Sequence, residues 1–486
     1  MIFADYEAVI GLEVHAELKT KSKIFCSCAT AFGATPNSQC CPICMGLPGA
    51  MPSLNRRAVE LAIKAGLLLH CEIARHSRID RKQYFYPDLP KAYQISQDTH
   101  PLCKNGYLDL TCASETLRVG IERIHIEEDA GKLIHGAEAT LVDYNRCGIG
   151  LIEIVSKPDL RTGEQAAAYL RTLREVLLAA DISDGKMQEG SLRCDVNLSV
   201  RKRGESVFGV RTEIKNLNSF SFVQKAIEYE FGRQCEILLS GGEVERETRR
   251  FDEQTGKTYS MRTKESAADY RFLIEPDLLS IAVDERELER IRGELPEMPA
   301  ERAQRLMQRF SIRESDAKIL VSDRWLADYF EATVAHTNAP LSALNLILGE
   351  LLRMSEGECF SSPILPRRVG ELADLLDTGI INSSTAKKLL SRLVTGDFDP
   401  REIVDREDLA QIRDEAVLRE VIVRVLDENP RAVRDYLGGK TNAIRALQGR
   451  AMAQTGGRAD PVLLEMLLPK MLNGSDVNAK GENGNV

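Results

Sequence analysis

Two carboxylates and one histidine lie on the same side of a strand that the sequence predicts near the N-terminus. Over residues 10–18 apolar residues alternate with a polar set that contains Glu13, His15 and Glu17. Alternate side chains of a strand point to the same side, so these three groups should project together. Carboxylates and an imidazole placed in this way can share a divalent cation. A solvated face of a half-buried strand is the ordinary alternative.

The same alternation recurs twice further along the chain. Over residues 193–200 it places Arg193, Asp195 and Asn197 on one face. Over residues 208–215 it separates an apolar set from a charged set, namely Phe208, Val210 and Ile214 against Arg211, Glu213 and Lys215. We therefore expect three strands that each carry charge on one face.

Acidic residues also occur where an unpaired charge would be costly. Glu153 lies within the apolar run 150–155, which otherwise predicts a fully buried strand. Glu127, Glu128 and Asp129 are consecutive. A buried carboxylate needs a cation or a proton, and adjacent carboxylates repel each other unless a divalent ion lies among them. Spacing alone leaves a Mg²⁺ site and a solvated acidic surface equally open.

Four of the twelve cysteines form two close pairs, Cys26 with Cys28 and Cys41 with Cys44. Two short pairs separated by a loop are typical of a tetrahedral four-thiolate zinc site. The protein would fill every ligand position, so we expect the zinc to be structural, with Cys40 left over. A redox pair and metal-free buried thiols are the alternatives, although a redox pair needs no second pair beside it.

Two segments favour contact with an anionic partner. Residues 81–94 interleave cations, aromatic residues and prolines, and include Lys82, Tyr84 and Tyr86. Such a loop can hold phosphate and a base or ribose, but a structural turn is equally consistent with its composition. Residues 430–458 contain six cations and one acid, Asp435, a net charge of six minus one, or +5: Arg431, Arg434, Lys440, Arg445, Arg450 and Arg458. Nucleic acid and a solvated helical face both remain open for this second segment.

The secondary-structure elements expected to position these residues differ between the N-terminal and C-terminal parts of the chain. Up to about residue 290 strands and helices are mixed, with helix starts predicted at Thr162 and Ser221, each followed by glutamine three residues later. Residues 296–400, with 319–351 as the clearest example, show dense helical periodicity. Residues 405–472 form a further helical region, and the polar stretch after them is expected to be disordered.

Composition sets broad limits on the class of protein. A chain of 486 residues with 43% hydrophobic and 28% charged residues is expected to form three or four soluble domains. The net charge of −9 argues against a protein that coats nucleic acid non-specifically. No stretch resembles a signal peptide or is long enough to span a bilayer, so we expect a cytoplasmic protein with no membrane partner.

Together these stretches occur in the order typical of one known family. The chain resembles the B subunit of bacterial tRNA-dependent amidotransferases, the GatB family, densely over residues 7–278 and more loosely beyond. The matching stretches are 11–20, the two cysteine pairs with 46–49, 81–94, 125–132, 143–146, 151–155, 189–197 and 213–219. The chain departs from the family pattern at 147–151, 271–279 and 446–450. These departures leave the metal-site residues intact and weaken the assignment of the C-terminal part.

The resemblance implies an α+β fold with several domains. The expected parts are an antiparallel-sheet cradle that resembles the catalytic fold of glutamine synthetase (1–293, with a zinc knuckle at 26–44), an all-α domain (294–404), an all-α YqeY-like tRNA-binding tail (405–474) and a disordered C-terminus (475–486).

The resemblance also implies an activity. The family's B subunit is an ATP-dependent carbon–nitrogen ligase that phosphorylates the side-chain carboxylate of mischarged Glu-tRNA(Gln) or Asp-tRNA(Asn) with ATP and Mg²⁺. Ammonia, which the amidase (the family's A subunit) releases from glutamine, then forms the amide that yields Gln-tRNA(Gln) or Asn-tRNA(Asn) for translation. A small adaptor, the C subunit, completes the heterotrimer. This chain shows no amidase Ser-Lys signature of its own.

Site residues follow from the matching motifs. The expected Mg²⁺ and nucleotide group is Glu13, His15, Glu127, Glu128 and Glu153, with Asp195 as a further ligand or a support. Lys82 and Arg193 are expected to hold phosphate, and Tyr84 and Tyr86 to shape the substrate and ammonia pocket. The zinc ligands would be Cys26, Cys28, Cys41 and Cys44, and the tRNA-binding residues Arg434, Lys440, Arg445, Arg450 and Arg458.

Two rival functions compete with this expectation. A zinc-ribbon scaffold for tRNA would explain the cysteines and the basic segment, but not Glu153 in an apolar run or three charged strand faces. A free-standing ligase that amidates free glutamate would have no use for the long helical C-terminal half. ATP hydrolysis stimulated by Glu-tRNA but not by glutamate separates the three.

Overall fold

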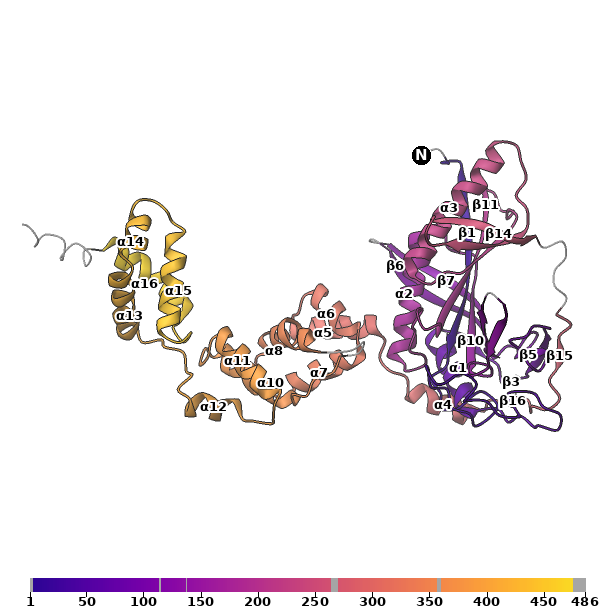
Figure 1. The fold of residues 1–486 in the computed structure, drawn as a ribbon, viewed down its shortest axis with the longest axis horizontal. Coiled ribbons are helices and arrows are strands. Elements are labelled where there is room, and N and C mark those ends of the chain that lie inside the picture. Colours follow the sequence, from indigo (N-terminus) through magenta and orange to yellow (C-terminus); the bar gives the residue numbers. More distant parts are fainter. Residues whose placement is uncertain (1–2, 113–114, 137, 264–269, 356–359, 475–486) are drawn as a thin grey trace, which may run out of the picture. The chain divides into compact units, whose positions relative to one another are not determined.

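The structure, a computed structural model, describes residues 3–112, 115–136, 138–263, 270–355 and 360–474. The chain divides into two compact units, Met1–Pro299 and Ala300–Val486. The first unit combines sheets with helices, and the described part of the second is built from helices, as the sequence predicts (Figure 1). The C-terminal residues 475–486, for which disorder was predicted, lie outside the described part.

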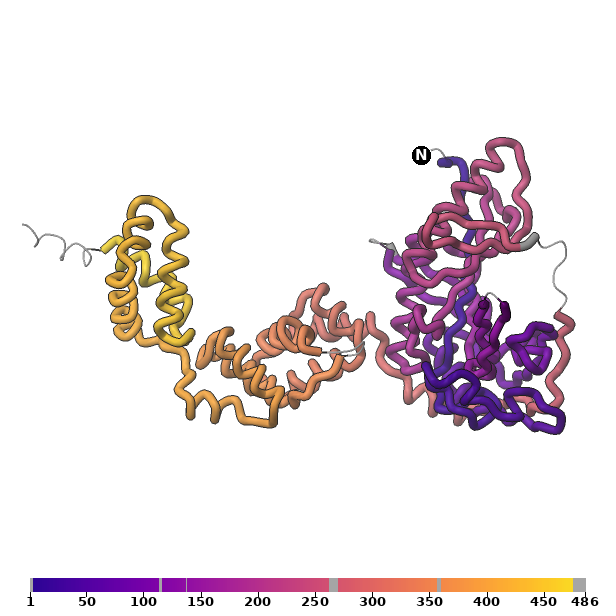
Figure 2. The backbone as a smooth tube through the Cα atoms, in the orientation of Figure 1, coloured from indigo at the N-terminus to yellow at the C-terminus, as the bar shows by residue number. Residues whose placement is uncertain are grey.

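A nine-stranded sheet is the framework of the first unit. Its strands, in spatial order, are β14 (Lys257–Thr263), β13 (Glu247–Asp252), β12 (Thr212–Lys215), β11 (Leu192–Lys202), β1 (Tyr6–Glu17), β10 (Gly150–Ser156), β7 (Glu115–Glu128), β6 (Cys103–Cys112) and β2 (Glu72–Ile73). Neighbours are antiparallel except β12 and β13, which run parallel and are joined through helix α3 (Phe220–Leu239). A parallel pair requires such a crossover. Strand β1, indigo in Figure 2, therefore lies between two strands from much later in the chain.

One face of this sheet is apolar and buried. Leu12, Val14 and Ile154 from the sheet share a core with Tyr169 and Leu173 of helix α2 (Gly163–Ala179). Helices α2 and α3 cover this face (Figure 1). Because strand residues alternate between faces, burial of the apolar set turns the polar set to the other side.

The starts of helices α2 and α3 test the two N-caps predicted from the sequence. Thr162 caps α2 as predicted, and its hydroxyl accepts a hydrogen bond from the Gln165 N–H at 3.1 Å. The predicted cap at Ser221 is wrong, because α3 starts earlier and Ser219 accepts from the Phe222 N–H at 3.2 Å. Serines at both positions suit an N-cap by type, and only the backbone conformation selects one of them.

The third predicted charged strand is shorter than its pattern suggests. Strand β12 begins at Thr212, and Phe208 and Val210 are 58% and 44% exposed instead of buried. Gly209 lies so close to the Val200 carbonyl that a side chain there would collide with it. Hydrogen-bonded strand pairing begins only at Thr212, and Ile214 is buried as predicted.

Smaller elements flank the large sheet in the first unit. They are β3 (His76–Ser77) with β16 (Ile281–Ala282), β8 (Lys132–His135) with β9 (Thr140–Asp143), the three-stranded set β15 (Leu273–Ile274), β4 (Asp80–Gln83) and β5 (Tyr93–Ser96), and helices α1 (Arg56–Leu68) and α4 (Glu285–Gly293). The three-stranded set is tied to the large sheet near β7, where the Ile126 N–H donates to the Gln97 side chain at 3.0 Å.

The second unit contains two separate apolar cores. The first core draws on α5 (Pro299–Phe310), α6 (Glu314–Val321), α7 (Arg324–Val334), α8 (Pro340–Leu346), the π-helical turn η1 (Ile347–Leu351), α10 (Pro366–Asp377), α11 (Ser383–Leu393) and α12 (Pro400–Arg406), with α9 (Leu352–Met354) following the π-helical turn. The second draws on α13 (Glu415–Glu428), α14 (Pro430–Leu437), α15 (Ala443–Gln454) and α16 (Pro461–Asn473). Among the described residues, no helix has the length and apolar character needed to cross a membrane.

Candidate active site

The polar face of the large sheet carries charged residues from four adjacent strands at one level. The strand register gives a row from β11, β1, β10 and β7: Arg193, His15, Glu153 and His125. One level along, Asp195 lies opposite Glu13. Residues paired across antiparallel strands point to the same side, so segments distant in sequence converge here.

His15 lies between two carboxylates. Its Nε2 is 3.3 Å from Glu127 Oε1 and 3.3 Å from Glu153 Oε2. Burial would lower the pKa of His15, but the hydrogen bond with Glu153 and the charges of Glu127 and Glu153 raise it to about 9. Burial would likewise raise the pKa of Glu153, yet His125 and His15 hold it well below the usual value. In this arrangement the imidazole supplies the positive charge that the two neighbouring carboxylates need.

The same three side chains suit one divalent cation. A single ligand atom from each of His15, Glu127 and Glu153 lies within 4.8 Å of the others. Ligands about 2.1 Å from an octahedral ion lie about 3 Å apart, close to the observed separations. All three were predicted as members of the Mg²⁺ group, and the structure brings them together.

A second group of carboxylates lies on the same face. Ligand atoms of Glu13, Asp195 and Glu213 also fall within 4.8 Å of one another. Burial and the charge of Glu153 raise the pKa of Glu13, and Asp195 and Glu213 add to the effect. Lys215 offsets part of this negative charge, with its Nζ 3.1 Å from Glu213 Oε1 and in contact with Asp195. Glu13 and Asp195 were predicted site residues, whereas Glu213 was noted only as part of a charged strand face.

His125 is a site residue that the sequence reasoning missed. Its Nε2 lies 3.5 Å from Glu153 Oε2 and 3.7 Å from Glu127 Oε2. Its Nδ1 is buried without a hydrogen-bond partner among the described residues. The sequence did contain a signal for this residue. His125 stands two residues before Glu127, so on a strand the two side chains must lie on the same face.

Glu128 does not join the group for which it was predicted. It is fully buried, and its Oε2 accepts from Lys91 Nζ at 2.7 Å while its Oε1 accepts from the Ile95 N–H at 2.8 Å. Adjacent residues of a strand point to opposite faces, so Glu127 and Glu128 cannot both reach the cation group. The charge of Glu128 raises the pKa of Lys91 against the effect of burial.

Arg193 is held at the edge of the row by an acidic partner. Its guanidinium lies 3.0 Å from Asp129 Oδ1, and Arg146 Nε lies 3.4 Å from the other oxygen of Asp129. Burial and the neighbouring charge of Asp129 raise the pKa of Glu17 to about 8. Arg193 is paired with His15 in the strand register, so the salt bridge with Asp129 holds its guanidinium at the edge of the row.

The predicted basic aromatic segment lies on the small three-stranded set. Lys82 is on β4, and its Nζ is 4.7 Å from the centre of the Tyr270 ring. Tyr84 and Tyr86 follow in the next loop, stacked on each other with ring centres 5.8 Å apart and partly exposed. The structure thus places these residues on a neighbouring element of the same unit instead of in the row on the large sheet.

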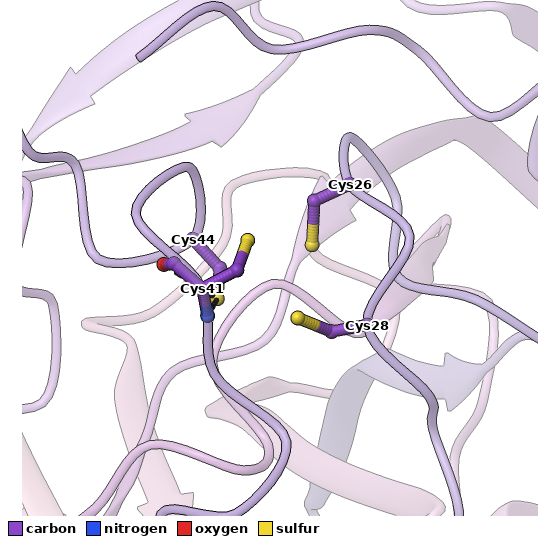
Figure 3. A group of neighbouring side chains, drawn as sticks. All are labelled: Cys26, Cys28, Cys41 and Cys44. Atoms are coloured by element: carbon purple, nitrogen blue, oxygen red, sulfur yellow. Dashed lines mark hydrogen bonds between the residues drawn. The ribbon is translucent and has the colours of Figure 1, made fainter.

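The four predicted zinc ligands converge from two loops. In Figure 3 the thiols of Cys26, Cys28, Cys41 and Cys44 point toward one another, and their sulfur atoms all lie within 4.8 Å. Sulfurs bound tetrahedrally at about 2.3 Å from zinc lie about 3.8 Å apart, so the donor set fits. Hydrogen bonding from the Cys26 thiol lowers the pKa of Cys44 to about 4 against the effect of burial, with help from the Cys41 amide and the charge of Lys23.

The basic residues of the tail differ in their surroundings. Arg434, Arg445 and Arg450 are exposed and form no salt bridge among the described residues. Lys440 is exposed but pairs with Asp435 at 3.0 Å. Arg458 is half-buried, with its guanidinium 2.6 Å from Asp408 Oδ2, and its predicted contact with tRNA stays a prediction.

The fold and the site together define a class of protein: a domain built on a large, mainly antiparallel sheet, one face of which gathers histidine and carboxylate side chains, in a chain that continues into helices. The family model described as "GatB/GatE catalytic domain" matches residues 8–289, and the one described as "GatB domain" matches residues 328–472. The chain therefore belongs to the GatB family.

Curated relatives support this assignment along nearly the whole chain. The B subunit of the aspartyl/glutamyl-tRNA(Asn/Gln) amidotransferase of Caldicellulosiruptor saccharolyticus is 50% identical over 476 residues, covering 96% of this chain and 99% of the relative. The protein of the same name from Caldanaerobacter subterraneus subsp. tengcongensis is 50% identical over 472 residues, with the same coverage.

Proposed function

We propose that this chain activates the side-chain carboxylate of glutamate or aspartate carried on tRNA, using ATP, so that ammonia can convert it to an amide. The relatives are named as subunits of an amidotransferase for Asp- and Glu-tRNA, and they align over 96% of this chain. The chemical need is clear, since a carboxylate oxygen is a poor leaving group and phosphate is a good one. This reaction makes the chain part of an ATP-dependent carbon–nitrogen ligase.

The observation that carries the proposal is the convergence on His15. Its Nε2 lies at 3.3 Å from carboxylates of two other strands, on a face that also gathers Glu13, Asp195 and Glu213. A scaffold without chemistry would have no reason to bring six such groups together. Their concentration on one face is typical of sites that handle phosphate through divalent ions.

Two sets of residues would hold the cations. His15, Glu127 and Glu153 form the first set, and Glu13, Asp195 and Glu213 the second. Bound Mg²⁺ would offset the charge that develops on the phosphate oxygens during transfer. This assignment removes Glu128 from the predicted ligands and adds Glu213.

The chemistry proceeds in two steps on the substrate. A carboxylate oxygen of the aminoacyl side chain attacks the terminal phosphorus of ATP, the bond to the bridging oxygen breaks, and ADP leaves. Ammonia then attacks the carbonyl carbon of the acyl phosphate, the bond to phosphate breaks, and the nitrogen loses a proton to give the amide. Arg193 and Lys215 face the site and can bind and orient phosphate oxygens. We assign Lys82, Tyr84 and Tyr86 to the approach of substrate or ammonia from the neighbouring set of strands.

The family resemblance supplies the setting for this reaction. We propose a cradle of the glutamine synthetase type over residues 1–293, a helical domain over 294–404 and a tRNA-binding tail over 405–474. The partners would be an amidase (the A subunit) that releases ammonia from glutamine, a small adaptor (the C subunit) and charged tRNA(Gln) or tRNA(Asn), in the cytoplasm. The four cysteines would hold a structural zinc.

The test uses the assembled complex with its amidase and adaptor subunits. We expect ADP release to rise with Glu-tRNA or Asp-tRNA and to remain at its basal level with free glutamate. Amide formation on each charged tRNA, with glutamine supplied, identifies the natural substrate. Stimulation by free glutamate alone would instead support a small-molecule ligase, and no stimulation by either tRNA would contradict the proposal.

A further inference from the structure

Lys23 is a fully buried lysine beside the four thiols. Its side chain is 0% exposed, and it lies just before the first cysteine pair. Its Nζ donates to Cys44 Sγ at 3.8 Å and to the Tyr144 carbonyl oxygen at 3.2 Å. The backbone N–H of the same residue donates to the Cys28 carbonyl at 3.0 Å, which fixes it against the other pair.

This ammonium group lacks the partner that buried lysines normally have. Among the described residues no carboxylate lies within salt-bridge distance of Lys23, whereas buried Lys91 contacts Glu128 at 2.7 Å. Burying an unpaired charge is costly, so a buried ammonium needs an anion nearby. The groups beside Lys23 that can carry negative charge are the sulfurs of the cysteine cluster, of which Cys44 is in hydrogen-bond contact with the ammonium group.

Charge balance therefore requires negative charge on the cysteine cluster, which either a metal-free Cys44 thiolate or a zinc-bound centre can supply. Four neutral thiols, or a redox pair in its disulfide form, would leave the ammonium uncompensated. Four thiolates around one Zn²⁺ carry a net charge of −2, because four negative charges meet two positive ones. One ammonium group against one of the sulfurs reduces the net charge of the buried centre to −1.

We propose that Lys23 is the counter-charge of a zinc–tetrathiolate centre and stabilises the metal-bound thiolate of Cys44. This inference rests on the proposed zinc binding and goes beyond it, because it assigns a role to a residue outside the ligand set. Groups next to the ligands of a metal tune its affinity and fix ligand orientation. By offsetting the net negative charge of the buried centre and favouring the deprotonated form of Cys44, Lys23 slows the loss of zinc.

The second contact of Lys23 extends the effect to the active site. The Tyr144 carbonyl belongs to the turn that leads to Arg146, and the neighbouring Asn145 side chain accepts from the Gln39 N–H of the cysteine loop at 2.8 Å. Arg146 contacts Asp129, which holds Arg193 at 3.0 Å. An intact metal centre thus supports the turn that backs the phosphate-binding arginine.

The decisive variant is Lys23→Gln, which keeps a donor for Tyr144 but removes the charge. The control variant is Lys21→Met, which replaces an exposed lysine two residues earlier in the chain. In the assembled complex we expect zinc release to a chromogenic chelator to be at least about tenfold faster for Lys23→Gln than for the wild type or the control, the range seen for changes next to metal ligands. In protein loaded with Co²⁺, the sulfur-to-cobalt charge-transfer band should shift for Lys23→Gln alone.

Each outcome has a distinct meaning. If Lys23→Gln matches the wild type in both release rate and absorption band, the charge of Lys23 plays no part and the inference is overturned. If the wild type itself takes up neither zinc nor cobalt, the proposed zinc site fails first. If Lys23→Gln does not fold, Lys23→Arg takes its place in the test, because arginine keeps the charge. Folding and slow zinc release with lysine or arginine at this position, but not with glutamine, support the inference.

Discussion

His15 and Glu153 face each other across the antiparallel pair β1 and β10, with Nε2 of the histidine 3.3 Å from Oε2 of the glutamate. The same nitrogen lies 3.3 Å from Glu127, on the strand beyond. Each of these side chains lies on the polar face of a strand of the large sheet, and each is stabilised there by its contacts with the others. The arrangement ties the chemistry of the site to the register of three strands.

Substitution of either residue should abolish tRNA-dependent phosphoryl transfer. We expect His15→Ala and Glu153→Gln each to lower ADP release with Glu-tRNA by about 10²-fold or more, because each would remove a ligand of the same proposed cation. The double variant should be little worse than either single one, since the residues act as a unit. Binding to the amidase partner serves as the control and should be unchanged. Full activity of Glu153→Gln would show that this carboxylate is structural.

Thr248 offers a milder test of the second cation group. Its hydroxyl is buried and donates to Glu213 Oε2 at 2.8 Å from the neighbouring strand β13. We expect Thr248→Val, which keeps the shape, to raise the Mg²⁺ concentration needed for half-maximal ATP hydrolysis several-fold, because Glu213 loses its orienting partner. Thr248→Ser should restore the wild-type requirement. Equal Mg²⁺ requirements for the valine and serine variants would exclude a positioning role.

Local periodicity predicts which face a residue occupies, and much of the site follows from it. The alternation around Glu13, His15 and Asp195 was correct, because one face of each strand is buried in a single core. The same rule places the consecutive residues Glu127 and Glu128 on opposite faces. It also places His125, two residues before Glu127, on the face of the candidate site. What periodicity cannot supply is the pairing between strands. The approach of β10 to β1 depends on the whole sheet, so periodicity does not predict the contact of His15 with Glu153, two residues that the family resemblance had placed in one group.

The ends of elements are less predictable for a related reason. Ser219 and Ser221 are both suitable caps, and the backbone around them decides which is used. Phe208 and Val210 fit a strand pattern, yet strand β12 begins only at Thr212 and both side chains are exposed. In the tail, the charge of Arg458 is visible in the sequence, but its partner Asp408 is not.

The buried pair on the opposite side of β7 gives a prediction about stability. Lys91 is 7% exposed at its side chain and Glu128 fully buried, with 2.7 Å between Nζ and Oε2. Lys91→Met should lower the free energy of unfolding by about 3–5 kcal/mol, because it leaves an uncompensated buried carboxylate. The double variant Lys91→Met, Glu128→Met should recover part of this loss in a urea titration. If Glu128→Gln instead raised the Mg²⁺ requirement of ATP hydrolysis, Glu128 would return to the ligand set.

The cysteine cluster predicts about one zinc ion per chain. Cys41→Ser should lower the zinc content and loosen the surrounding loops, because a four-thiolate site tolerates no missing ligand. Cys71, which is buried and lies outside the cluster, provides the control, since Cys71→Ser should keep the metal. Metal analysis of the reduced wild type, prepared without chelators, is the direct measurement. A wild-type protein without zinc would remove the assignment.

The basic tail makes a prediction about substrate binding. Arg434, Arg445 and Arg450 are exposed on α14 and α15 without acidic partners among the described residues, in a chain whose net charge is −9. If this surface binds tRNA, triple charge reversal should weaken the affinity for charged tRNA and lower its dependence on salt. Each phosphate contact contributes about 0.7–0.9 to the slope of log affinity against log salt concentration, so loss of three contacts should reduce it by about 2–3.

The controls separate this surface from general electrostatic effects. Arg419 lies on α13 and already pairs with Glu415, so reversal of its charge should change the affinity little. Arg458→Ala should destabilise the start of the tail, because its guanidinium holds Asp408, without lowering the salt dependence. Deletion of residues 405–486 should raise the KM for charged tRNA while ATP binding and assembly with the amidase partner persist. If the deleted protein binds tRNA as tightly as the full chain, residues 1–404 hold the substrate without the tail and the basic surface of the tail is only a solvated helical face.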